Sequence, residues 1–97
     1  MNISPLVNEN GYAVRNQIII KTDKATYFQS YKSVICKLDG NNIILSQHWD
    51  YSNTTRKHLY AFLRQHGYYT ITNKKSIKEF IAKGVIKLAD VPSINII

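Results

Sequence analysis

The residues best placed to do chemistry are cationic side chains on a helix predicted between the cap-forming residues 50–55 and Gly67. Arg56, Tyr60 and Arg64 recur every four residues and Lys57 flanks them, so the spacing predicts one stripe on the outward side of this helix. Guanidinium and ammonium groups contact phosphates, and a tyrosine ring can stack on an unpaired base. The stripe is a candidate nucleic-acid surface, and the alternative is an ordinary solvated helix face.

A second group of cations, Lys74, Lys75 and Lys78, begins a second predicted helix. Positive charge near a helix N-terminus opposes the helix dipole at a cost of some tenths of a kcal/mol each, which favours a use in binding, although exposed lysines also serve solubility. Residues 51–97 carry eight of the thirteen Lys and Arg residues and two of the six acids, a net +6 of the total +7. An acidic partner is therefore expected to meet this half of the chain.

Aromatic residues precede the first predicted helix. Trp49 or Tyr51 can pack against the helix while Asp50 or Ser52 caps it, and this structural role is one interpretation of the segment. The other is an exposed recognition patch, because Trp and Tyr are favoured at binding hot spots. Strand alternation likewise predicts that at least one of the aromatic residues at positions 27, 28 and 31 is displayed.

Metal binding and catalysis have little support. The intervals between Cys36, His48, His58 and His66 match none of the paired spacings of structural zinc sites. Cys36 lies in an apolar run and is expected to be a buried structural thiol. The six scattered acids offer no nucleophile and base pair, and there is no glycine-rich phosphate loop. We therefore expect a protein that is not an enzyme and that needs neither metal nor cofactor.

The strand and helix patterns of the sequence predict an α+β fold, which would position these candidate residues. The expected architecture is an antiparallel meander of three to four strands followed by two helices and a short C-terminal strand. The strands are predicted at residues 12–21, 26–30, 32–38 and 43–46, and the second helix from Thr72 or Asn73 to Gly84. Residues 85–88 are expected to form a short edge strand or a packed extension. Residues 1–11 are expected to form a loosely held arm, and residues 12–97 one domain.

Three stretches resemble a family of small uncharacterised proteins of bacteriophages and plasmids of Gram-positive bacteria. They are Asn16-Gln17-x-Ile19-Ile20, Tyr27-Phe28-Gln29-Ser30-Tyr31-x-Ser33-x-Ile35 and Trp49-Asp50-Tyr51-Ser52-x-Thr54-Thr55-x-x-x-Leu59-x-x-Phe62-Leu63. The resemblance covers residues 16–63 and implies a strand meander followed by a helix, with no catalytic residues. At the level of class alone, the chain is similar to anti-CRISPR proteins in size and in its lack of catalytic motifs. Its +7 charge departs from those that imitate DNA with an acidic surface.

Three functions follow as hypotheses. The first is a mobile-element accessory protein that inhibits a Cas nuclease or ribonucleoprotein, or binds its nucleic acid, through the two cationic groups. The second is a stand-alone DNA- or RNA-binding module that uses the same residues, and the third is an assembly subunit that self-associates through Trp49, Tyr51 and the strand aromatics. Without a signal peptide or an apolar run near the roughly 20 residues of a membrane span, the expected location is the cytoplasm of the bacterial host.

Overall fold

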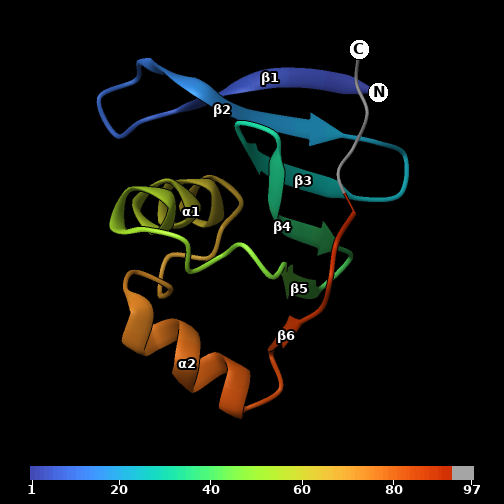
Figure 1. The fold of residues 1–97 in the computed structure, drawn as a ribbon, viewed down its shortest axis with the longest axis vertical. Coiled ribbons are helices and arrows are strands. Elements are labelled where there is room, and N and C mark those ends of the chain that lie inside the picture. Colours follow the sequence, from blue (N-terminus) through green and yellow to red (C-terminus); the bar gives the residue numbers. More distant parts are fainter. Residues whose placement is uncertain (93–97) are drawn as a thin grey trace.

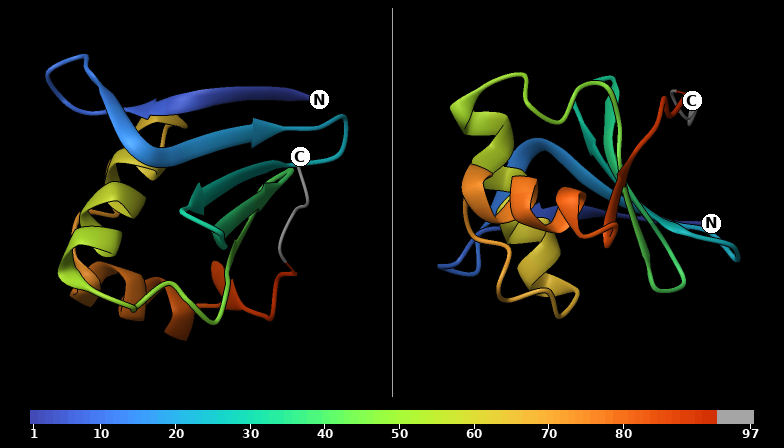
Figure 2. Two further views of the ribbon diagram at one scale, coloured as in Figure 1. Left: turned by 45° about the horizontal axis from the view of Figure 1, so that its top comes forward. Right: turned by 90° about the horizontal axis from the view of Figure 1, so that it is seen from below.

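The computed structural model describes residues 1–92 and shows a twisted six-stranded sheet with two helices on one face (Figure 1 and Figure 2). The strands lie in the order β1-β2-β3-β4-β5-β6, and neighbours are antiparallel except β5 and β6, which are parallel. The elements are β1 (Asn2–Val7), β2 (Ala13–Lys21), β3 (Thr26–Ser30), β4 (Ser33–Asp39), β5 (Asn42–Leu45), α1 (Asn53–Gln65), α2 (Lys74–Ala82) and β6 (Ile86–Leu88). The predicted α+β class, with a meander followed by two helices, is confirmed.

Short turns join the antiparallel strands. Asn8 holds the β1–β2 loop, because its Oδ1 accepts hydrogen bonds from the backbone N–H groups of Asn10 (2.9 Å) and Tyr12 (3.0 Å). In the β4–β5 turn, Gly40 has a φ of 60°, a left-handed conformation that glycine adopts without a steric penalty. Both turns therefore close hairpins of antiparallel strands.

The expectation of a loosely held arm over residues 1–11 is wrong for residues 2–7. These residues form β1 and pair with β2. Leu6 is fully buried and belongs to the core. Pro5 lies in the outermost strand, where a residue without an N–H is tolerated, and the register shifts between Pro5 and Val7. The proline and the single buried side chain hide the alternation that would mark a strand, and the domain includes β1.

Capping residues set the starts of both helices. Ser52 is the N-cap of α1, and its side chain accepts a hydrogen bond from the Thr55 N–H (3.0 Å). Asn73 is the N-cap of α2 and forms a capping box with Ser76. A glycine with positive φ follows each helix, as predicted: Gly67 (91°) and Gly84 (76°).

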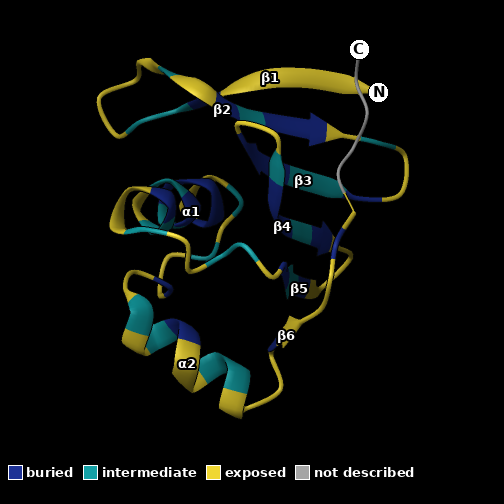
Figure 3. Ribbon diagram, in the orientation of Figure 1, coloured by how far each residue is buried: buried dark blue, intermediate teal, exposed yellow. Residues whose placement is uncertain are grey.

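The core lies between the sheet and α1. Phe28 of β3 stacks on Phe62 of α1 with ring centroids 5.5 Å apart, and both side chains are fully buried. Figure 3 shows buried positions gathered in the middle strands and on part of α1, whereas α2 is mostly exposed or half-buried and buries only Ile77. Cys36 is fully buried and forms no disulfide, which confirms the predicted buried thiol, and this burial raises the pKa of the thiol far above its ordinary value.

The chain after α2 returns to the sheet through β6. Its first residue, Ile86, is buried and aligns with Ile43 of β5, which confirms the predicted short strand. Within residues 1–92, neither helix has the length and apolar character needed to cross a membrane.

Candidate functional site

Asp50 connects the two groups of basic residues singled out by the sequence. The Arg56 guanidinium donates hydrogen bonds to the side-chain oxygens of Asp50 and Asn53. Lys74 Nζ lies 2.9 Å from the other carboxylate oxygen of Asp50. Asp50 precedes α1, Arg56 lies in α1 and Lys74 begins α2, so one carboxylate joins both helices. We call Asp50, Arg56 and Lys74 the Asp50 clamp.

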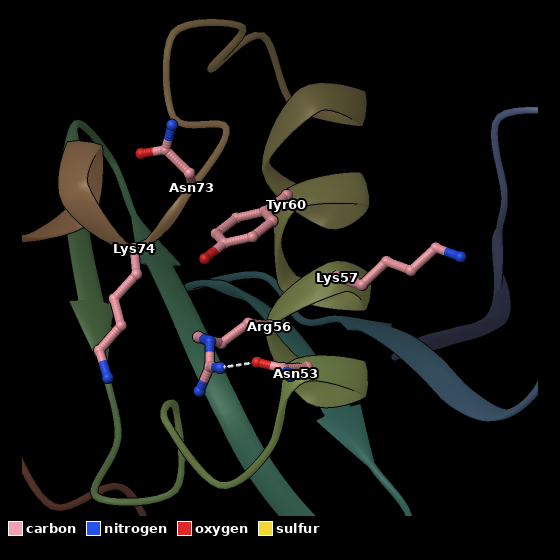
Figure 4. Close-up of a pocket in the computed structure, with 6 residues that line it drawn as sticks. All are labelled: Asn53, Arg56, Lys57, Tyr60, Asn73 and Lys74. Carbon is pink, nitrogen blue, oxygen red and sulfur yellow. Dashed lines mark hydrogen bonds between the residues drawn. The ribbon is translucent and has the colours of Figure 1, made fainter.

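The clamp lies beside a hollow of about 390 Å³ between the helices (Figure 4). Arg56 and Tyr60 from α1 and Lys74 from α2 point toward this hollow, whereas the Lys57 ammonium extends away from it. The Arg56 side chain is only 16% exposed. The predicted outward stripe is therefore wrong for Arg56, which turns toward α2 because Asp50 and Asn53 offer acceptors there.

Two groups in this region have shifted pKa values. Hydrogen bonding from Lys74 is the main cause that lowers the pKa of Asp50. Burial opposes it, and the charges of Lys74 and Arg56 lower the pKa further. Burial is the main cause that raises the pKa of Tyr60. At neutral pH the clamp therefore holds an ionised carboxylate beside a neutral phenol. Tyr60 is half-buried against the core, so its ring is not a free stacking surface.

Four of the predicted cations remain exposed. Lys57 and Arg64 are seven residues apart on α1, which places them on the same side of the helix. Lys75 and Lys78 are exposed on α2. Among the described residues, none of these four forms an ion pair with an acidic side chain. We call Lys57, Arg64, Lys75 and Lys78 the exposed basic residues.

The two aromatic residues before α1 have separate roles. Trp49 is half-buried and packs against the core, which agrees with the structural interpretation. Tyr51 is 83% exposed. Tyr31 is also exposed, so one of the three aromatic residues at positions 27, 28 and 31 is displayed, but it is displayed by the β3–β4 turn and not by strand alternation. Tyr51 and Tyr31 are thus the aromatic rings accessible to a partner in this region.

Both exposed tyrosines border a second hollow that the sequence reasoning missed. A cavity of about 810 Å³ is bounded by β2, the β3–β4 turn, the loop before α1 and the first two turns of α1. Its lining includes Arg15, Gln17 and His58, and we call it the Gln17 cavity. Arg15 and His58 are 43 positions apart, so no local spacing reveals their proximity. The one available signal was Gln17, a polar residue directly before the apolar run of β2.

The residues considered as zinc ligands stay apart. Among residues 1–92, no group of three or more His, Cys, Asp or Glu side chains is placed to hold a metal ion. His48 and His58 line the Gln17 cavity, His66 packs on the Phe62 ring, and Cys36 lies in the core. Burial is the main cause that lowers the pKa of His58, and the charge of nearby Lys57 adds to it. His48 and His58 thus share one cavity, whereas His66 and Cys36 lie in surroundings of their own.

The fold and its hollows define a small α+β protein in which two helices cover one face of a mostly antiparallel sheet. Residues 1–81 match the sequence model of a family of unknown function, DUF8033, and the chain belongs to this family. The matched region contains the Asp50 clamp, the exposed basic residues and every residue that lines the Gln17 cavity. No curated protein and no solved structure matches the chain.

Proposed function

We propose that the protein is a non-enzymatic accessory factor of a mobile element that binds single-stranded nucleic acid through the exposed basic residues. The observation that carries this proposal is that Lys57, Arg64, Lys75 and Lys78 stand exposed on α1 and α2 without ion pairs among residues 1–92. The carboxylate of Asp50 is already engaged by two other cations, and Glu79, which lies beside Lys75 and Lys78 on α2, forms no ion pair among the described residues. Four exposed cations on two joined helices supply the phosphate contacts that dominate nucleic-acid affinity.

The arrangement favours backbone contact over reading of sequence. A helix-turn-helix joins its two helices by a turn of three to four residues, whereas residues 66–73 separate α1 from α2 here. Exposed Tyr51, close to the start of α1, offers a ring for an unpaired base. These features support binding to single strands with little sequence preference.

The test is fluorescence anisotropy with labelled single- and double-stranded DNA and RNA at about 50 and 200 mM salt. Binding should be tightest for a single strand and should weaken by orders of magnitude between the two salt concentrations. The double variant Lys57→Glu, Arg64→Glu should lose most of this affinity.

A charge-matched control is Lys21→Glu, Lys24→Glu, in which two exposed lysines at and beyond the end of β2 are reversed. Each pair of reversals lowers the formal charge by four units, from +7 to +3. If both double variants weaken binding equally, overall charge and not the helical surface carries the affinity, and the proposed site is wrong.

A second candidate function is inhibition of a protein complex that handles nucleic acid, such as a Cas effector. The exposed rings of Tyr31 and Tyr51 favour it, because tyrosine is enriched at protein interfaces. Absence of binding to every bare nucleic acid at both salt concentrations would refute the first proposal. Capture of a purified Cas ribonucleoprotein by the wild type, and not by a Tyr31→Ala, Tyr51→Ala variant, would then support the second.

A further inference from the structure

The Gln17 cavity contains a buried acceptor that the protein leaves without a partner. Gln17 is 3% exposed, it lines the cavity, and its Oε1 has no hydrogen-bond partner among the described residues. Nδ1 of His58, which lines the same cavity, is also buried without a partner. Buried polar atoms are normally hydrogen-bonded, because leaving them unpaired forfeits their hydration without return. Oε1 itself is closed to solvent, so a ligand that carries a hydrogen-bond donor would satisfy it once the Gln17 amide turns toward the cavity.

The charge around the cavity favours an anion. Arg15 is among its lining residues, and no Asp or Glu lines it within residues 1–92. The N-terminal end of α1 also borders it, through the N-cap Ser52 and through Thr54 and Thr55 of the first turn. The N–H groups of a first helical turn carry partial positive charge and bind phosphate and carboxylate groups.

The rim of the cavity provides flat rings. Tyr31 and Tyr51 line it and are 68% and 83% exposed. The backbone fixes the position of Tyr31, since its N–H donates to the Asn16 carbonyl (2.8 Å) and its carbonyl accepts from the Gln29 side chain (3.0 Å). The backbone of Tyr31 also has a φ of 54°, a value that residues other than glycine rarely adopt. The turn therefore holds an aromatic residue where glycine would be the easier choice.

From these features we infer that the Gln17 cavity binds one nucleotide, with its phosphate toward Arg15 and the start of α1 and the donor edge of its base toward Gln17. The volume of about 810 Å³ falls in the range of roughly 300–1,000 Å³ typical of small-molecule sites. A glutamine amide pairs with base edges that combine a donor and an acceptor, and the tyrosine rings suit the base faces. None of the exposed basic residues lines this cavity, so variants at Gln17 and Arg15 test it separately from the proposed function, with which it shares only Tyr51.

The same chemistry is present in a free mononucleotide and in one unit of a single strand. Isothermal titration of the full chain with AMP, GMP, CMP and UMP tests the first source, and titration with a 5′-phosphorylated single-stranded tetranucleotide tests the second. Inorganic phosphate and the unphosphorylated nucleosides serve as the two halves of the ligand. We expect a mononucleotide or the tetranucleotide to bind more tightly than either half.

Two variants address the cavity directly. Gln17→Leu removes the acceptor while keeping a similar volume, and Arg15→Ala removes an exposed cation without touching the core. Each should weaken binding about tenfold, the loss expected from one buried hydrogen bond or one charge-assisted contact. Arg64→Ala is the matched control and should leave mononucleotide affinity unchanged. If Gln17→Leu does not fold, as judged by thermal unfolding, Arg15→Ala and Tyr31→Ala carry the test.

The outcomes separate the two proposals. Mononucleotide binding that is weakened by Gln17→Leu or Arg15→Ala supports the inference and shows that a free nucleotide can be the ligand. If only the tetranucleotide binds, and the same variants weaken that binding, the inference is supported with one unit of a single strand as the ligand. Absence of binding to all of these probes overturns the inference that the Gln17 cavity binds a nucleotide. Tetranucleotide binding that persists in the cavity variants but disappears in Lys57→Glu, Arg64→Glu also overturns it, and leaves the proposed function intact.

Discussion

Replacing Asp50 with Asn should weaken the fold and strengthen nucleic-acid binding at the same time. Asp50 pairs with Arg56 and Lys74 and is 35% exposed, and partly exposed ion pairs contribute about 0.2–1 kcal/mol each to stability. Loss of both pairs should therefore lower the free energy of unfolding by about 1 kcal/mol, which corresponds to about 4–8 °C in melting temperature for a domain of this size. The substitution keeps the shape of the side chain, so charge is the property that changes.

The effect on binding should have the opposite sign. Asp50→Asn raises the formal charge from +7 to +8 and releases Arg56 and Lys74 toward the solvent. Each newly contacted phosphate steepens the slope of log affinity against log salt by about 0.7 on a single strand, so two released cations should steepen it by up to about 1.4. Anisotropy titrations at four or five salt concentrations measure this slope, and thermal unfolding followed by circular dichroism measures the stability.

Asp23→Asn is the matched control, because Asp23 is exposed in the β2–β3 turn and forms no ion pair among the described residues. It makes the same change in net charge and should leave both the melting temperature and the salt slope close to the wild type. The reasoning is refuted if Asp50→Asn melts like the wild type, or if its salt slope equals that of Asp23→Asn.

Three further predictions concern the core and the titrating groups. Phe62→Ala should lower the free energy of unfolding by about 3–5 kcal/mol, since it opens a cavity against Phe28, and urea unfolding should show a lower midpoint. The wild type should be more stable than Asp50→Asn by the full amount above the unfolded carboxyl pKa of about 3.9. This difference in stability should vanish as the pH falls through the lower pKa of Asp50 in the folded state. A pH-independent difference would contradict the ion-pair account. Cys36 should react with a thiol reagent only at the rate of unfolding, because its pKa is raised and its side chain is fully buried, and rapid labelling of the native protein would show that the core opens there.

Local signals in the sequence were enough for most of the fold. The caps at Ser52 and Asn73 and the turn at Gly40 act within a few residues of themselves, so their effect could be predicted from neighbouring positions. β1 could not, because Pro5 interrupts its pattern and its partner is supplied by the edge of β2. A strand that forms mainly by pairing with a neighbouring strand cannot be predicted from the pattern of its own residues.

The site was predicted less completely than the fold. Helical spacing placed Arg56 and Arg64 on one stripe, but spacing treats a helix as isolated and takes no account of Asp50, which lies before the helix and turns Arg56 toward α2. The Gln17 cavity depends on the register of β2 against β3 and on the packing of α1 over the sheet. Neither can be predicted from the order of residues, so the sequence did not indicate that Arg15 and His58 line the same cavity.

The parallel pairing of β6 with β5 has a consequence for how the native protein opens. Ile86 aligns with Ile43, 43 positions earlier, so this contact closes a long loop, and α2 within that loop completely buries a single side chain, Ile77. Regions with few buried contacts open below the free energy of global unfolding, and amides of α2 and β6 should exchange with solvent as one cooperative unit before those of the meander. A strand of nucleic acid that contacted both α1 and α2 would hold this unit closed. Slower amide exchange in α2 and β6 would then report binding, even at amides that contact no base.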